Sequence, residues 1–211
     1  MNEMNTVAEW VGERISRAEL FEDLGIDFCC GGNRTLKEAC EERQIPLLDV
    51  LYRLRLPDSS PNDSSWVSYT PAQLCDHIEQ THHAYLKKAL PRIAHHLEKI
   101  VLAHGDLYLP LLKTFSLFTS EIESHMDKEE GEVFPLYRSA DPASLAKIHE
   151  LEEEHQEAGR LLAEMRRLAH NYQLPPHACN TLKLAWSELE NLEADMHLHV
   201  FKENHYLFPR K

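Results

Sequence analysis

The sequence lacks any apolar run long enough to cross a membrane. Its apolar stretches are short and interrupted, whereas a membrane-spanning helix needs about 20 consecutive apolar residues. The N-terminus is polar and acidic, and it lacks the basic and apolar regions of a signal peptide. These absences predict a cytoplasmic protein that does not bind membranes.

Positive charge is scarce as well. The chain has 22 lysine and arginine residues against 35 aspartate and glutamate residues, and its formal net charge is −13. Because nucleic-acid binding needs clustered positive side chains, this balance argues against a nucleic acid partner. The five cysteines are odd in number and include no Cys-x-x-Cys pair. This pattern excludes the disulfide framework usual in secreted proteins and the usual thiolate zinc site.

The first 76 residues contain no histidine, and all fourteen histidines follow them. The polar stretch 58–65, rich in proline and serine, is the predicted linker between a small domain, 1–57, and a larger one, 66–211. The small domain is predicted to consist of four short helices, over about 6–15, 17–24, 35–43 and 46–54. Cys29-Cys30-Gly31-Gly32 forms the turn between the second and third of these helices.

The larger domain has the periodicity of four long amphipathic helices. The first begins at Thr70-Pro71 and ends near Gly105, and the second covers about 107–137. The third begins at Asp141-Pro142, and the fourth begins near Pro175-Pro176. Short connections make neighbouring helices antiparallel. With no strand pattern in competition, the chain is predicted to be all-α, with a small helical domain followed by an up-down-up-down four-helix bundle.

One pattern occurs twice, 74 residues apart. His125-Met-Asp-Lys-Glu129 is followed by Phe134-Pro135, and His199-Val-Phe-Lys-Glu203 is followed by Phe208-Pro209. Residues four apart lie on one face of a helix, about 6 Å apart along its axis. Each copy therefore directs an imidazole and a carboxylate to the same side, as metal binding requires.

Counting along the predicted helices brings these residues to one level. His83, His125, His155 and His199 each lie about 12 to 13 residues, or roughly 18–20 Å, from the same end of the bundle. Glu129 and Glu203 lie one turn closer to that end. By periodicity alone, His82 is as well placed as His83.

Burying four histidines and two carboxylates without a cation would be costly, because each desolvated carboxylate costs several kcal/mol. Six ligands without a thiolate are too many for one zinc ion. They suit two iron or manganese ions bridged by both carboxylates, with room for a bridging oxygen and an open position. Such a position would bind a small ligand such as dioxygen, peroxide or nitric oxide.

These six residues resemble the hemerythrin HHE domain. The segment Gly25-Ile-Asp-Phe-Cys29-Cys30-Gly31-Gly32, with Leu36-Lys-Glu-Ala-Cys40 after it, is similar to the small domain of the bacterial iron–sulfur cluster repair di-iron proteins (Repair of Iron Centres). The resemblance implies that the protein holds two oxygen-bridged iron ions. It also implies a cytoplasmic protein that is often a homodimer. The iron ligands that it implies are His83, His125, Glu129, His155, His199 and Glu203, and both glutamates would bridge the two ions. It thus favours His83 over His82.

The resemblance further implies the restoration of iron–sulfur proteins damaged by nitric oxide or peroxide. Three functional hypotheses stay open: a protein that supplies iron, an enzyme that reduces nitric oxide to nitrous oxide, and a sensor of oxygen or nitric oxide. Cys29 and Cys30 are either a redox pair or packing residues of the small domain. Glu121 and Glu154 are candidates for outer partners of the ligands or for an iron exit path, and Glu121 could equally be a solvated charge.

Overall fold

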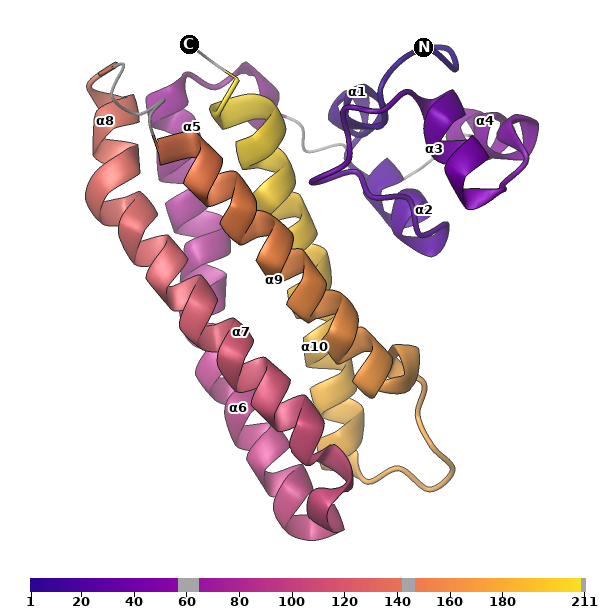
Figure 1. The fold of residues 1–211 in the computed structure, drawn as a ribbon, viewed down its shortest axis with the longest axis vertical. Helices are drawn as coiled ribbons and strands as arrows, with labels where there is room; N and C mark the ends of the chain where they lie inside the picture. Colours follow the sequence, from indigo (N-terminus) through magenta and orange to yellow (C-terminus); the bar gives the residue numbers. More distant parts are fainter. Residues whose placement is uncertain (57–64, 142–146, 210–211) are drawn as a thin grey trace. The chain divides into compact units, whose positions relative to one another are not determined.

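A computed structural model describes residues 1–56, 65–141 and 147–209 (Figure 1). The chain divides into two compact units, one formed by Met1–Leu74 with Leu198–Lys211 and the other by Cys75–His197. Apart from Ser65, the predicted linker 58–65 lies outside the described residues, as does Pro142 of the predicted start of the third long helix.

Short helices make up the N-terminal part of the first unit. They lie within one or two residues of the predicted ranges. Two of them begin with a capping box, in which Thr6 pairs with Glu9 and Thr35 pairs with Glu38. The helices are α1 (Val7–Glu13), α2 (Arg17–Asp23), α3 (Leu36–Arg43), α4 (Leu47–Arg55) and the 3₁₀ turn η1 (Ser65–Ser68).

Aromatic side chains from distant parts of the sequence join this unit together. The ring of Phe28 contacts Phe201 edge to face, with 5.7 Å between ring centroids. The indole of Trp66 contacts both Phe201, at 6.2 Å, and Tyr206, at 4.8 Å. Trp66, Phe28 and Phe201 are all buried. Burial of these large rings holds the end of the chain against the small helical domain.

The second unit is a helical bundle in which α7 packs on α6 and α9 (Figure 1). The described part of the chain contains no strand, and the predicted all-α fold is confirmed. None of the described helices is long and apolar enough to span a membrane. Its α-helices are α5 (Pro71–Ile78), α6 (Ala84–His104), α7 (Leu109–Lys128), α8 (Phe134–Arg138), α9 (Ile148–Leu168) and α10 (Asn180–Lys202), of which α5 and α10 extend beyond the unit.

Three π-helical turns interrupt helices that the sequence predicted as continuous. They are η2 (Glu79–His83), η4 (Glu129–Val133) and η7 (Glu203–Leu207). In a π-turn an N–H bonds to the carbonyl five residues earlier, so one extra residue enters the helix. Phe134 N–H bonds in this way to the Glu129 carbonyl, and Phe208 N–H to the Glu203 carbonyl at 2.9 Å.

The predicted start of the fourth long helix was wrong by about four residues. The helix α10 begins at Asn180, and Pro175-Pro176 lies in the preceding loop. Ala178 N–H bonds to the Pro175 carbonyl at 3.1 Å, which closes a turn. His177 has a φ of 64°, in the left-handed region, and a helix cannot pass through it. The start at Thr70 behaves as predicted, since Thr70 and Gln73 exchange capping hydrogen bonds.

Gly32 and Gly131 offer a matched test of this packing. A Cβ on Gly32 would overlap the carbonyl oxygen of Phe28, whereas a Cβ on Gly131 would meet nothing within 4 Å. Gly32→Ala is therefore expected to lower the free energy of unfolding by about 1–3 kcal/mol. Gly131→Ala should leave it unchanged or raise it by up to about 1 kcal/mol. Urea unfolding of both variants measures the difference, and equal midpoints would contradict the packing described.

Candidate metal centre

Four candidate ligands belong to the bundle unit. His83 ends the turn η2, His125 lies in the last turn of α7, Glu129 opens the turn η4, and His155 lies in α9. Their side chains are almost completely buried, with 0–2% of each residue exposed. Buried histidines and a buried carboxylate need polar or ionic partners.

Glu129 presents its two oxygens to two different histidines. Its Oε2 lies 3.3 Å from Nε2 of His83, and its Oε1 lies 3.4 Å from Nε2 of His125. A carboxylate that bridges two metal ions has this arrangement, in which each oxygen serves a different ion. The geometry within this unit alone therefore fits a bridging role for Glu129.

His125 and His155 approach each other through the same ring nitrogen. Their Nε2 atoms lie 3.1 Å apart. Two nitrogen ligands at about 2.1 Å from one ion, at roughly a right angle, would stand about 3 Å apart. The separation thus fits two imidazoles that bind one metal ion.

The second copy of the repeated motif has the same local geometry. His199 is in the last turn of α10, and Glu203 opens the turn η7 directly after it. Nε2 of His199 lies 3.0 Å from Oε1 of Glu203, and both side chains are fully buried.

Two groups of potential ligand atoms satisfy the spacing of a metal site, within 4.8 Å of one another. The first contains His83 and His199, the second contains His125 and His155, and Glu129 and Glu203 belong to both. Two histidines for each group and two shared carboxylates are the donor set predicted for a pair of ions. The structure brings His83, His125, Glu129 and His155 together within the bundle unit, and His199 and Glu203 together within the first unit. The assignment of all six as ligands is a proposal.

Two candidate ligands of the bundle unit, His83 and His125, have a carboxylate partner on their other ring nitrogen. Nδ1 of His83 donates to Glu130, and Nδ1 of His125 donates to Glu154, each at 2.8 Å. Because an ionised carboxylate only accepts, each Nδ1 carries the proton, and Nε2 presents its lone pair to the cluster. The hydrogen bond from His125 lowers the pKa of Glu154 to about 2, against the effect of burial, and Lys128 adds to this effect.

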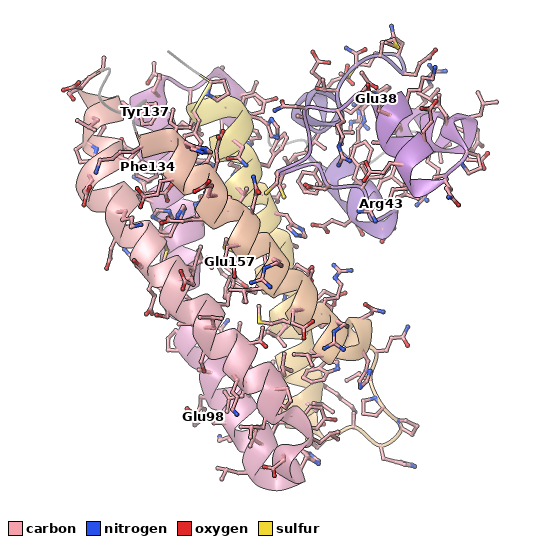
Figure 2. All side chains as sticks on the ribbon, viewed as in Figure 1. Glu38, Arg43, Glu98, Phe134, Tyr137 and Glu157 are labelled. Carbon is pink, nitrogen blue, oxygen red and sulfur yellow. The ribbon has the colours of Figure 1, made fainter. Side chains whose placement is uncertain are left out.

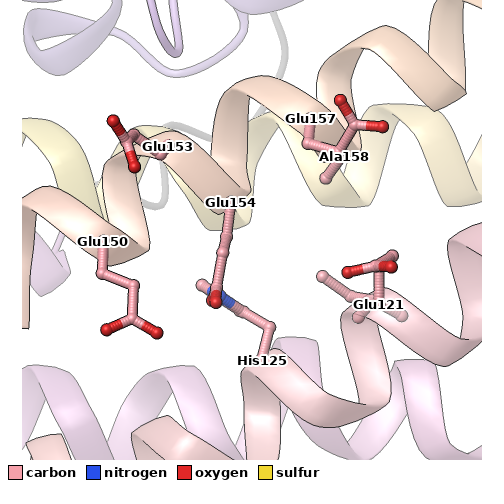
Figure 3. A pocket seen from close by; sticks show the side chains of 8 residues that line it. Glu121, His125, Glu150, Glu153, Glu154, Glu157 and Ala158 are labelled. Atoms are coloured by element: carbon pink, nitrogen blue, oxygen red, sulfur yellow. The ribbon is translucent and has the colours of Figure 1, made fainter.

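Sequence reasoning found Glu154 but missed Glu130, because adjacent residues of a regular helix point in different directions. Glu121 lines a hollow of about 290 Å³ beside His125, together with Glu150, Glu154 and Glu157 (Figure 3). Figure 3 shows Glu154 directed toward His125, whereas Glu121 lies one turn away.

The choice between His82 and His83 follows from their partners. Both lie in the turn η2, and both are buried, with 4% of His82 and 0% of His83 exposed. Nδ1 of His82 bonds to Asp195 at 2.9 Å, and His82 belongs to neither ligand group. The geometry therefore supports His83.

Cys29 and Cys30 are free thiols whose sulfur atoms lie 3.9 Å apart. Asp27 accepts hydrogen bonds from the backbone N–H groups of Cys29, Cys30 and Gly31, which fixes the turn. The hydrogen bond with Cys30, together with burial, raises the pKa of the Cys29 thiol well above its usual range. At neutral pH Cys29 is therefore a protonated thiol.

Comparisons with known proteins match both parts of the chain. The ScdA_N family, described as a domain of unknown function (DUF542), matches residues 3–57, and the hemerythrin HHE cation binding domain matches residues 76–210. The iron–sulfur cluster repair protein YtfE of Escherichia coli O157:H7 is 31% identical, over 90% of this chain and 89% of its own length. The iron–sulfur cluster repair protein ScdA of Staphylococcus epidermidis is 32% identical, over 97% and 96%. The chain belongs to the family of iron–sulfur cluster repair proteins that carry a hemerythrin HHE domain.

Membership of this family confirms the resemblance drawn from the two motif sets. The cation-binding domain covers all six candidate ligands. The matched domain is described as cation binding, and the donor set of the buried histidines and glutamates fits a metal ion.

Removal of a ligand should release metal without unfolding the bundle. His125→Ala and Glu203→Ala are each expected to lower the metal content from two ions per chain to one or none, since each removes a donor from the cluster. Helical content should stay near that of the wild type, because the apolar core is untouched, while the free energy of unfolding should fall, because buried carboxylates lose their cations. Elemental analysis and circular dichroism measure both quantities. Full metal occupancy in either variant would show that the ligands have been misassigned.

The raised pKa of Cys29 predicts an order of reactivity. Cys179 is exposed and Cys29 is buried, and only a thiolate reacts rapidly with iodoacetamide. At pH 7.5 Cys179 should be alkylated at least tenfold faster than Cys29, as peptide mass spectrometry can measure. Preferential labelling of Cys29 would point to an activated thiolate instead.

Proposed function

We propose that this protein repairs iron–sulfur clusters damaged by nitrosative or oxidative stress, and that it does so in the cytoplasm by supplying iron from a pair of ions held by the six buried residues. Its partners are then damaged iron–sulfur proteins, and its site also binds small ligands such as nitric oxide, dioxygen or peroxide. The proposal takes its direction from the relatives named as iron–sulfur cluster repair proteins.

The observation that carries the proposal is the sharing of carboxylates. Glu129 directs one oxygen to each of two histidines, and both Glu129 and Glu203 belong to each ligand group. One ion would need only one such group. Two groups with common carboxylates support a pair of ions, and nitrogen and oxygen donors without thiolate suit iron.

The chemistry of the donors also supports the release of iron. Carboxylates are hard ligands, and histidines take up protons close to neutral pH, so such a site can give up its ions. The acidic hollow beside His125 offers carboxylates of Glu121, Glu150 and Glu154 along a way out to solvent. These residues would attract a departing cation. No contact of the described residues favours nitric oxide reduction or sensing over this role.

Transfer of iron to a damaged partner tests the proposal. The iron-loaded protein, mixed with a cluster-free dehydratase, sulfide and a reductant, should restore the activity of the dehydratase faster than an equal concentration of free iron. His125→Ala provides the control, because it should carry less iron and restore proportionally less activity. The same reaction vessel is sampled for nitrous oxide after addition of nitric oxide.

Failure to reactivate the partner, with the iron still bound, would remove iron supply as the function. Nitrous oxide above the level made by free iron would instead favour the nitric oxide reductase reading. The predicted homodimer and the redox role of Cys29 and Cys30 stay predictions, which sedimentation and the Cys29→Ala, Cys30→Ala double variant can address.

A further inference from the structure

Three residues in or directly after the turn η4 surround the candidate ligand His83. Oε2 of Glu129 lies 3.3 Å from Nε2 of His83, and Oε1 of Glu130 lies 2.8 Å from Nδ1 of the same ring. The ring of Phe134 stacks on the imidazole, with centroids 5.7 Å apart and planes inclined by 16°. His83 is thus held at both ring nitrogens and on one face.

A regular α-helix could not supply these three contacts. Successive residues of an α-helix are turned by about 100°, so Phe134 would point about 140° away from Glu129. The π-turn η4 inserts one extra residue, and Phe134 N–H bonds to the carbonyl of Glu129, five residues before it. Residues five apart therefore come to the same side.

Pro135 accounts for the position of this turn. Proline has no N–H, and its ring collides with the carbonyl four residues earlier in an α-helix. The widened turn ends at Val133, two residues before Pro135, and so relieves the collision between the proline ring and that carbonyl. The second copy of the motif repeats the arrangement, since η7 starts at Glu203 and Pro209 stands six residues after it, as Pro135 stands six after Glu129.

Lys87 completes the arrangement on the solvent side. Its Nζ lies 2.7 and 2.8 Å from the two oxygens of Glu130. The ammonium group of Lys87 and the Nδ1 nitrogen of His83 both contact the Glu130 carboxylate, which accepts a hydrogen bond from each.

We propose that Glu130 and Phe134 are positioning residues for His83, and that the π-turn η4, fixed by Pro135, brings both to it. Glu130 keeps the proton on Nδ1, so Nε2 presents its lone pair to a cation, and Phe134 fixes the plane of the ring. The inference rests on the metal centre put forward under the proposed function. Loss of a hydrogen-bonding partner of this kind typically weakens metal binding 10- to 100-fold.

Binding of Co²⁺ to the metal-free protein tests the inference. Competition with a chelator gives the dissociation constants, and the visible spectrum of bound Co²⁺ reports its coordination. Glu130→Ala should weaken the binding of one of the two Co²⁺ ions 10- to 100-fold. Glu130→Gln, whose amide oxygen still accepts from Nδ1 of His83, should restore most of the affinity. Phe134→Leu, which keeps apolar volume but not the stacked ring, should change the Co²⁺ spectrum.

Glu132→Ala is the matched control, because Glu132 lies in the same turn but is exposed and pairs with Lys147. It should bind both ions like the wild type. Nitrogen-15 NMR of the metal-free protein gives an independent readout, since the Nδ1-protonated form of His83 should dominate in the wild type and lose its dominance in Glu130→Ala.

Wild-type affinity for both ions in Glu130→Ala, with an unchanged His83 tautomer, would overturn the positioning role and leave the metal centre intact. A wild-type protein that binds no Co²⁺ or iron would instead overturn the metal centre itself, and the positioning role with it. A Glu132→Ala variant as weak as Glu130→Ala would show that any change in the turn disturbs binding, which would also reject a specific role for Glu130.

Discussion

The arrangement of this protein depends on the burial of two carboxylates. Glu129 and Glu203 are fully removed from water, among histidines that are almost as deeply buried. Moving one such anion out of water costs several kcal/mol, and a single unpaired carboxylate would destabilise the fold by a large fraction of its total stability. The pair of cations proposed above, shared by both carboxylates, would offset that cost. The outer carboxylates Glu130 and Glu154 are paired with Lys87 and Lys128, so the lysines balance the negative charge that surrounds the cluster.

The π-turns serve this burial. Each one places a candidate ligand at its boundary, His83 at the end of η2, and Glu129 and Glu203 at the starts of η4 and η7. A helix that continued regularly could present a ligand and its apolar neighbours only at spacings of three or four residues. The extra residue lets a ligand and the phenylalanine five residues later face the interior together (Figure 2 labels Phe134). The repeated Phe-Pro is therefore explained by backbone geometry, not by contact with the cation.

Much of this was visible in the sequence, and the reasons are local. The helices predicted to begin near residues 6, 35 and 70 do begin there, because the hydroxyls of Thr6, Thr35 and Thr70 each accept a backbone N–H from the residue three positions later. Counting residues from the ends of antiparallel rods placed the six ligand candidates at one level, because helix rise is nearly constant. Three features escaped prediction. The π-turns leave no periodic signal in the sequence. Glu130 is adjacent to a candidate ligand, so in an α-helix it would lie on a different face. The positive φ of His177 keeps α10 from starting before Asn180.

The two copies of the motif share a backbone and differ in what their turns hold. In η4 the residue after the ligand is Glu130, which holds His83. In η7 that position is Asn204, and the next is His205; both donate to the carbonyl oxygen of Cys29, at 3.3 and 2.9 Å. Burial lowers the pKa of His205, so the ring is neutral and its Nε2 proton is available for this bond. Because Glu203 starts the same turn, this candidate ligand and the two side chains that bond to the Cys29 carbonyl belong to one short segment. The duplicated turn therefore makes different contacts in its two copies, with a candidate ligand histidine in one and with the cysteine turn in the other.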